Sequence, residues 1–188
     1  MKFEENYPVL KRDLISIAKE FGSPLYVYDA ETIARQYKRL TSSFPGVDLK
    51  VKYACKSLTN LAVMKYIRSL GAGLDAVSIE EVLIGMKAGF LPAEILFTPN
   101  SVGFDEIREA VKLGVKINID NISILEQFGH EYGNSYPCCI RLNPHIAAGG
   151  NSHIQTGHID SKFGISVYQL RHIERIIKSC NMKINGLH

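Results

Sequence analysis

Hydrophobic and polar residues along the chain alternate between two patterns, one typical of strands and one typical of helices. Short apolar runs of strand type are each followed by a longer segment with apolar residues three and four positions apart, as in amphipathic helices. The predicted strands span residues 48–55, 72–78, 94–99, 116–121, 138–144 and 181–188. The helices predicted between them span residues 58–71, 79–89, 104–114, 122–133 and 167–179. Gly71, Gly89 and Gly114 stand at three helix ends, where glycine favours a left-handed cap.

The N-terminal region has a different order of elements. Apolar spacing predicts a helix over residues 7–22, a short strand over 23–29 ("SPLYVYD") and an amphipathic helix over 30–44. We interpret residues 1–30 as a helix and strand that lead into the main domain, which spans residues 31–188.

Strands that alternate with helices predict right-handed crossovers and a parallel sheet. An open doubly wound sheet and a (β/α)8 barrel both fit this order. The first strand–helix turn carries no G-x-G-x-x-G fingerprint, which weakens the dinucleotide-binding form of the open sheet. Polar residues instead follow several strands, and barrel enzymes build their sites at such strand ends. These residues are Lys56, Asp75, Asn100, Asp120, Arg141, Asn143 and His188. We therefore favour the barrel.

Composition narrows the function. The chain has 188 residues, 46% of them hydrophobic and 22% charged, and its net charge of +3 is too small and scattered to indicate nucleic-acid binding. We see neither a secretory signal nor an apolar run long enough for a membrane helix. The 4 cysteines lack disulfide or metal spacing, which favours reduced thiols in the cytoplasm. His145, His153 and His158 fall in a polar loop, so we expect no metal site.

Lys56 in "VKYACKSLTN" is the strongest candidate for chemistry. It ends a run patterned like a buried strand, and lysine is almost never buried without a partner or a task. A desolvated amine loses its proton more readily and can then act as a nucleophile that forms an imine. The structural alternative is a surface lysine whose stem lies along the strand end.

Five motifs in order carry a family resemblance from about residue 22 onward: "VKYACK", "GLDAVSIEEV", "IRLNP", "SKFGI" and "INGLH". Together they resemble the fold-type III decarboxylases that depend on pyridoxal 5'-phosphate, the alanine-racemase-like barrels. The resemblance implies that Lys56 anchors the cofactor and that His188 lies flat against its ring. It also implies that Asp75 and Arg141 bind near the lysine as part of the cofactor site. Catalytic roles fall to Lys56 and His188.

Other matched residues have structural alternatives. Asp75 and Arg141 could form an ion pair that closes the barrel mouth. Glu81 suits the first turn of a helix whatever its function, and Ser78 is expected to cap that helix. Asn143 and Lys162 lie within matched motifs, and we assign them no role beyond shaping the site.

The segment "HIQTG" followed by "SKFG" resembles the diaminopimelate-type members of the family more than the ornithine or arginine types. This implies decarboxylation of meso-2,6-diaminopimelate to L-lysine, with a small amino acid as substrate and a homodimer as the active form. Ser57-Leu58 departs from many relatives, which leaves the substrate less secure. Ornithine, arginine or carboxynorspermidine decarboxylases and racemases remain alternatives. So do a non-catalytic pyridoxal-phosphate carrier and a barrel without cofactor.

Family members are longer than this chain. We expect the chain to be an N-terminal fragment that holds about six of the eight barrel strands. The Gly-rich phosphate loop, the acidic partner of the pyridine nitrogen and a C-terminal β domain would then follow His188. The fragment alone is expected to be inactive.

Overall fold

A six-stranded parallel sheet forms the centre of the computed structural model, which describes residues 14–146, 156–158 and 161–188. The strand order is β1-β2-β3-β4-β5-β8, and every neighbouring pair is parallel. The strands are β1 Lys52–Ala54, β2 Gly73–Ala76, β3 Ile95–Phe97, β4 Lys116–Ile119, β5 Cys138–Ile140 and β8 Ile184–Leu187. All six strands predicted from the alternating pattern are therefore confirmed, in chain order.

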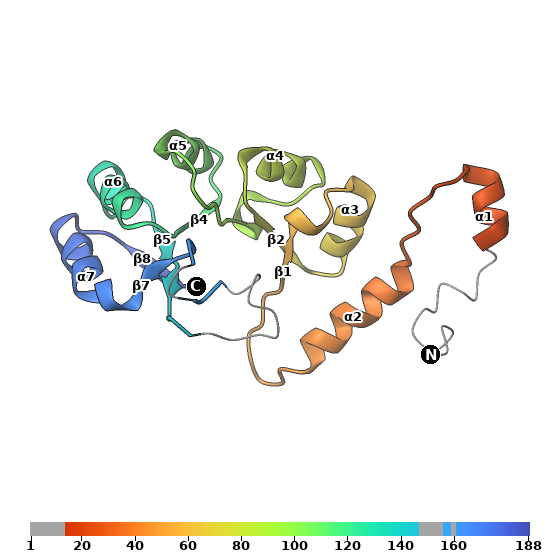
Figure 1. Cartoon of the computed structure of the whole chain (residues 1–188), viewed down its shortest axis with the longest axis horizontal. Coiled ribbons are helices and arrows are strands. Elements are labelled where there is room, and N and C mark those ends of the chain that lie inside the picture. The colour runs from red at the N-terminus through yellow and green to blue at the C-terminus, as the bar shows by residue number, and fades with distance from the viewer. Residues whose placement is uncertain (1–13, 147–155, 159–160) are drawn as a thin grey trace.

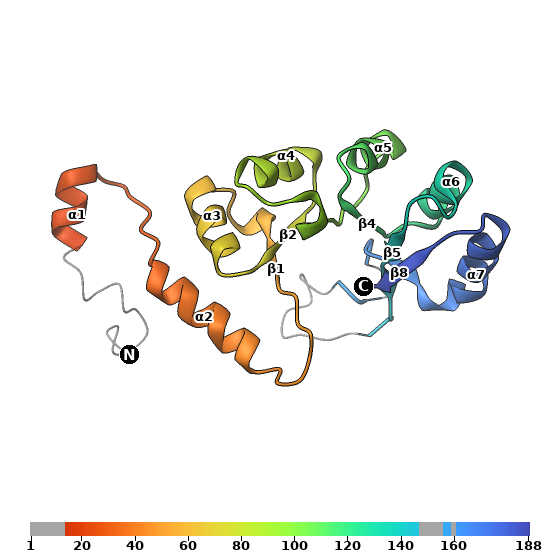
Figure 2. The ribbon, with the colours of Figure 1, turned by 180° about the vertical axis from the view of Figure 1, so that it is seen from behind.

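Helices cover one side of this sheet. They are α3 Leu61–Ser69, α4 Ile79–Lys87, α5 Phe104–Lys112, α6 Ile122–Tyr132 and α7 Leu170–Ser179, with 3-10 turns η3 Cys55–Ser57, η4 Pro92–Glu94 and η6 Val167–Gln169. Figure 1 shows α3 to α7 as an outer arc with the strands on its inner side, and Figure 2 shows the same arc from behind. Within the described residues, β1 and β8 each pair with one neighbour. The arrangement confirms an incomplete (β/α)8 barrel.

The hydrophobic core lies between the sheet and the outer helices. Successive strand residues point to opposite faces, so the outward residues of each strand meet the helices. Ile95, Phe97 and Ile117 contribute this outward face, and Val82 and Ile107 meet it from α4 and α5. Each of these five side chains is essentially inaccessible to solvent. The other face of the strands carries the polar side chains of Asp75 and Asn118 beside Leu96 and Cys139.

The helix ends confirm the predicted glycine caps. Gly71, Gly89 and Gly114 all have positive φ, as a left-handed cap requires. At the other ends, the Asn60 and Asn121 side chains accept hydrogen bonds from backbone N–H groups of α3 and α6. These caps turn the chain sharply and hold each strand end beside its neighbours.

The N-terminal elements leave the arc. Helices α1 (Leu14–Phe21) and α2 (Ala30–Ser42) extend away from it in Figure 1, and neither contains a buried residue. The strand predicted over residues 23–29 is wrong: this segment has no partner strand within the described residues. Its apolar side chains have no sheet to cover, and Tyr26 is 87% exposed. The predicted helix begins outside the described residues.

A second, two-stranded sheet was not predicted. Strand β6 (Leu142–Asn143) pairs in parallel with β7 (Ile165–Ser166) and joins the two ends of the long polar segment between them. Gly164 makes the join possible, because its φ is +80° and a Cβ there would lie 2.9 Å from the backbone N of Asn143. This accounts for the glycine in "SKFGI".

Candidate active site

One cavity of about 360 Å³ lies at the carboxyl ends of the barrel strands. Its lining residues are Lys56, Asp75, Val77, Thr98, Asn100, Arg141, Thr156, Lys162, Phe163 and His188. The structure thus brings together all four residues singled out in the sequence: Lys56, Asp75, Arg141 and His188. They come from the ends of β1, β2, β5 and β8, as expected when parallel strands end at one edge of a barrel.

Lys56 lies on the 3-10 turn that ends β1. Two local bonds hold this turn: Ser57 Oγ donates to the Ala54 carbonyl at 2.7 Å, and Tyr53 Oη donates to the Leu58 carbonyl at 2.9 Å. The Lys56 side chain is exposed rather than buried, so the desolvation expected from its strand-like surroundings is not seen. A surface lysine would be equally exposed. Lys56 differs from one because it shares a cavity with three other candidate residues.

Asp75 is held from the neighbouring strand. The Thr98 hydroxyl, just past β3, donates a hydrogen bond to Asp75 Oδ1, and the Thr98 backbone N–H donates to the Ala76 carbonyl at 2.8 Å. Thr98 is buried, so this contact is shielded from water. A charge-assisted bond of this kind fixes the direction of the carboxylate. Asp75 therefore presents its negative charge to the cavity in a defined orientation.

Arg141 is held by backbone and ring contacts rather than by an acid. Its backbone N–H donates to the Ile119 carbonyl, and its carbonyl accepts from the Ile165 N–H, both at 2.8 Å. The guanidinium carbon lies 4.6 Å from the Phe163 ring centroid, which is a cation–π contact. Among the described residues, Arg141 and Asp75 form no ion pair. The alternative of an ion pair closing the barrel mouth is therefore not what this structure shows.

His188 directly follows β8, the last strand of the sheet. Its backbone donates to the Ile140 carbonyl and accepts from the Leu142 N–H, both at 2.9 Å. The residue as a whole is exposed, but its imidazole lies in the cavity, 3.1 Å from Asn118 Nδ2 through its Nδ1. Partial desolvation of the ring lowers the pKa of His188, and the positive charge of Arg141 lowers it further, while Asp75 opposes both. Burial and Arg141 together favour the neutral form of the imidazole over the charged form.

Ser78 and Glu81 serve the start of α4. Ser78 Oγ accepts a hydrogen bond from the Glu81 N–H at 3.2 Å, and Glu81 Oε2 accepts from the Val77 N–H at 2.9 Å. The reciprocal arrangement is close to a capping box. It confirms the expected cap and favours the structural reading of Glu81, although Val77 still brings this helix start to the cavity wall.

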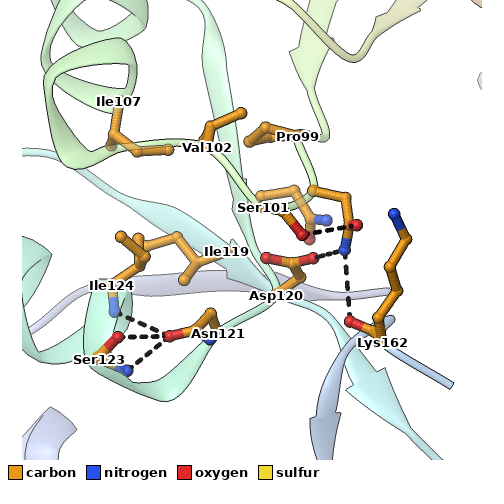
Figure 3. A pocket seen from close by; sticks show the side chains of 12 residues that line it. Pro99, Ser101, Val102, Ile107, Ile119, Asp120, Asn121, Ser123, Ile124 and Lys162 are labelled. Atoms are coloured by element: carbon orange, nitrogen blue, oxygen red, sulfur yellow. Dashed lines mark hydrogen bonds between the residues drawn. The ribbon is translucent and has the colours of Figure 1, made fainter. Parts of the chain in front are cut away.

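A smaller cavity of about 180 Å³ adjoins the first and shares Asn100 and Lys162 with it. The Asn100 side-chain amide joins the two sides, donating to Asp120 Oδ2 at 2.6 Å and to the Lys162 carbonyl at 3.4 Å (Figure 3). Lys162 therefore stands at the boundary of the two cavities. Asn143 is buried, and its amide donates to the His158 carbonyl at 3.0 Å, so it shapes the loop as expected.

Sequence reasoning missed three residues that hold the candidate groups: Thr98, Asn118 and Phe163. Thr98 was visible as a polar residue at a strand end in "EILFTP", and Asn118 as the one amide within the apolar "KINI". Phe163 belonged to a matched motif without a role. No pattern in the sequence links any of the three to its partner, because each contact joins elements distant in the chain.

We expected no metal site in the polar loop that contains His145, His153 and His158. The structure describes His145 and His158, whereas His153 lies outside the described residues. Across the described ranges, no group of three His, Cys, Asp or Glu residues is placed to hold a metal ion. In the same ranges, no helix combines the length and apolar character that crossing a bilayer requires.

The cavity combines an amine, an imidazole, a carboxylate and a guanidinium at the carboxyl ends of parallel strands. This is the position of the active site in α/β-barrel enzymes. Residues 30–188 match the family described as "Pyridoxal-dependent decarboxylase, pyridoxal binding domain". The chain belongs to this family, and its cofactor is pyridoxal phosphate.

Three relatives illustrate the match. Diaminopimelate decarboxylase of Methanothermobacter thermautotrophicus is 38% identical over 178 residues, which cover 94% of this chain and 42% of that protein. The structure of Helicobacter pylori diaminopimelate decarboxylase complexed with L-lysine has a TM-score of 0.83 and 26% identity, covering 94% of this chain and 46% of that one. Lysine/ornithine decarboxylase from Vibrio vulnificus, complexed with putrescine, has a TM-score of 0.76 and 26% identity, covering 93% and 43%. This chain spans less than half the length of each.

The donor set of the cavity fits the cofactor. An aldehyde needs a primary amine, and no hydrogen bond or ion pair within the described residues occupies the Lys56 amine. An aromatic cofactor ring would stack on a planar group, and the His188 imidazole is such a group in this cavity. Arg141 and Lys162 add positive charge to the same cavity, which suits a ligand that carries negative charge.

Proposed function

We propose that this chain carries the cofactor site of an enzyme that decarboxylates meso-2,6-diaminopimelate to L-lysine. The observation that carries the proposal is the meeting of Lys56, Asp75, Arg141 and His188 in one cavity at the carboxyl ends of the strands. The identity of 38% to an archaeal diaminopimelate decarboxylase supports the choice of substrate. The polar substrate has two amines and two carboxylates, and the cavity offers charged side chains of both signs.

When bound, pyridoxal phosphate supplies an aldehyde that attaches to an amine and a ring that accepts the electrons left when carbon dioxide departs. In our proposal Lys56 provides the attaching amine and yields its place to the substrate amine. His188 would hold the cofactor ring by lying against its face, and the neutral form of the imidazole would add no charge there. Asp75, aligned by Thr98, sets a negative field near the Lys56 amine. Arg141, steadied by Phe163, brings positive charge to the same cavity.

The arrangement of the whole protein is part of the proposal. We assign residues 1–30 to a lead-in segment and 31–188 to the partial barrel, with a C-terminal β domain beyond this chain. The start of the family match at residue 30 supports this boundary. We also propose a homodimer in the cytoplasm, as the family resemblance implies, and an inactive fragment when residues 1–188 stand alone.

The test uses the full-length protein that contains this chain, loaded with pyridoxal phosphate. It is offered meso-diaminopimelate, ornithine, arginine, lysine or carboxynorspermidine, and release of carbon dioxide is measured together with the amine or amino-acid product. We expect kcat/KM to be highest for meso-diaminopimelate, with L-lysine as product.

Preferred turnover of ornithine or lysine would replace the substrate but keep the reaction, and the likeness to the Vibrio enzyme makes this the first alternative to examine. Cofactor binding without turnover of any of these compounds would favour the carrier alternative. Light scattering on the same preparation tests the dimer, since a monomer that is fully active contradicts that part of the proposal.

A further inference from the structure

Asn118 is a buried polar side chain in the middle of β4. It is 0% exposed and lies between Ile117 and Ile119, which both belong to the hydrophobic core. Because side chains alternate along a strand, Asn118 points to the opposite face, toward the inside of the barrel. A buried amide is costly unless its polar atoms are hydrogen-bonded. Its placement therefore calls for a reason.

The one partner of the Asn118 side chain in the described residues is His188. Asn118 Nδ2 lies 3.1 Å from His188 Nδ1, whereas Asn118 Oδ1 is buried and has no hydrogen-bond partner in the part of the chain that the structure describes. A purely structural buried asparagine would have both ends bonded. Unsatisfied groups of this kind are expected where function, rather than stability, selects the residue.

The sheet leaves a path for this contact. Asn118 on β4 is in register with Cys139 on β5, and Cys139 is in register with Gly186 on β8. His188 follows two residues after Gly186 and so emerges on the same face. Gly186 has no side chain, and a Cβ there would lie 3.3 Å from Cys139 Sγ. The glycine thus leaves room for the Cys139 side chain on this face, and the Asn118 amide still reaches the His188 imidazole beyond β5.

We propose that Asn118 is a positioning residue for His188, which fixes the plane of the imidazole and keeps its proton on Nε2. The proposal rests on the function proposed above, in which His188 lies against the cofactor ring. A neutral imidazole has one N–H donor and one bare nitrogen acceptor. The amide N–H of Asn118 donates to Nδ1, so Nδ1 must be the bare nitrogen and Nε2 must carry the proton.

Most charges around His188 also favour its neutral form, and Asp75 is the exception. Arg141 disfavours a second proton on the ring and Asp75 favours one, while Lys56 and Lys162 also line the cavity and add positive charge. Asn118 itself lines the smaller cavity, so it joins the wall of that cavity to the ring of His188. The residue thus acts on the reaction through His188 and does not itself touch the larger cavity.

The direct test is the tautomer of His188 in the full-length protein. Selective ¹⁵N-histidine labelling and NMR, with His188→Gln to assign the signal, report which ring nitrogen carries the proton. We expect the proton on Nε2 in the wild type. A wild-type ring protonated on Nδ1 overturns the proposal without any variant of Asn118, and the measurement needs neither substrate nor turnover.

Two variants extend the test. Asn118→Asp places an acceptor beside Nδ1, so the proton should move to Nδ1 and the pKa of His188 should rise above its wild-type value. Asn118→Leu removes the donor at similar volume, so the tautomer should become mixed. Turnover in both should fall by up to about 100-fold, as for a misplaced reacting group, and the acid limb of kcat/KM for Asn118→Asp should move to higher pH.

Asn134→Asp is the matched control, since Asn134 is exposed in the turn after α6 and undergoes the same change in charge. It should titrate and turn over as the wild type does. Folded Asn118 variants whose His188 keeps the wild-type tautomer and titration would overturn the proposal. A changed tautomer in a protein that acts on another amino acid would instead correct the proposed substrate and leave the role of Asn118 intact.

Discussion

Lys56 is the residue on which the proposed chemistry depends, and its test is spectroscopic. Its amine is exposed in the cavity and held by no partner among the described residues, so it is available to the aldehyde of the cofactor. We expect Lys56→Ala to abolish the absorbance band of the lysine-bound cofactor and all measurable turnover. Lys65→Ala, an exposed lysine on α3, should leave both unchanged. A borohydride-reducible adduct that persists in Lys56→Ala would show that another amine is the anchor.

Asp75 and Arg141 should affect turnover more than cofactor affinity, because each acts on the field around the reacting groups. Loss of one charge-assisted contact is worth about 1.5 to 3 kcal/mol, so Asp75→Ala and Arg141→Ala should each lower kcat by about 10- to 150-fold. Titration of the apoprotein with cofactor gives the affinity for comparison. Asp48→Ala, a change at a surface acid, is the control. If both site variants keep wild-type kcat, their roles are structural.

At this scale the sequence predicted candidate groups that share one cavity, but not the groups that hold them. Lys56, Asp75 and His188 were recognisable because each is a chemically distinctive residue at a strand end. Thr98 and Asn118 were not recognisable, because their hydrogen-bond partners lie far away in the chain. Asp75 is 23 residues from Thr98, and His188 is 70 residues from Asn118. Exposure was also wrong for Lys56, since the pattern of β1 does not reveal how the 3-10 turn after it directs the side chain.

Helix α4 begins beside the cavity, and its cap gives a prediction at the scale of one element. Ser78→Ala removes the acceptor of the Glu81 N–H and should lower the free energy of unfolding by about 1 kcal/mol. Ser78→Asp keeps an acceptor and a favourable charge at the helix N-terminus, so it should be nearly neutral. Urea denaturation of the full-length protein measures both. Equal losses in the two variants would mean that the side-chain cap is not what stabilises this helix start.

Elements could be predicted where local pattern and tertiary contacts agree. Strand β3 and the segment 23–29 are both short, apolar and flanked by punctuating residues, and both were predicted to be strands. The two differ in their neighbours: β3 lies between β2 and β4, whereas residues 23–29 have no strand beside them in the described part of the chain. A strand exists through its pairing, which periodicity alone does not report. The small β6–β7 sheet was missed for the same reason.

The whole molecule presents an arc with two open strand edges, and its N-terminal part carries exposed apolar side chains. Within the described residues β1 and β8 each lack a second neighbour, and unpaired parallel edges invite pairing with other chains. Ile15 and Phe21 on α1 are each 68% exposed, and Tyr26 follows at 87%. Apolar groups gathered in this way mark surfaces that associate when nothing covers them.

We therefore expect residues 1–188, expressed alone, to associate or aggregate and to release no carbon dioxide from any diamino acid. Size-exclusion chromatography with light scattering measures the association, and a carbon dioxide assay with added pyridoxal phosphate measures the activity. The double variant Phe21→Glu, Tyr26→Lys should reduce association if the exposed N-terminal surface drives it. An unchanged state would assign the association to the strand edges. A well-behaved monomer that turns over diaminopimelate would contradict both the incomplete barrel and the assignment of further site residues to a longer chain.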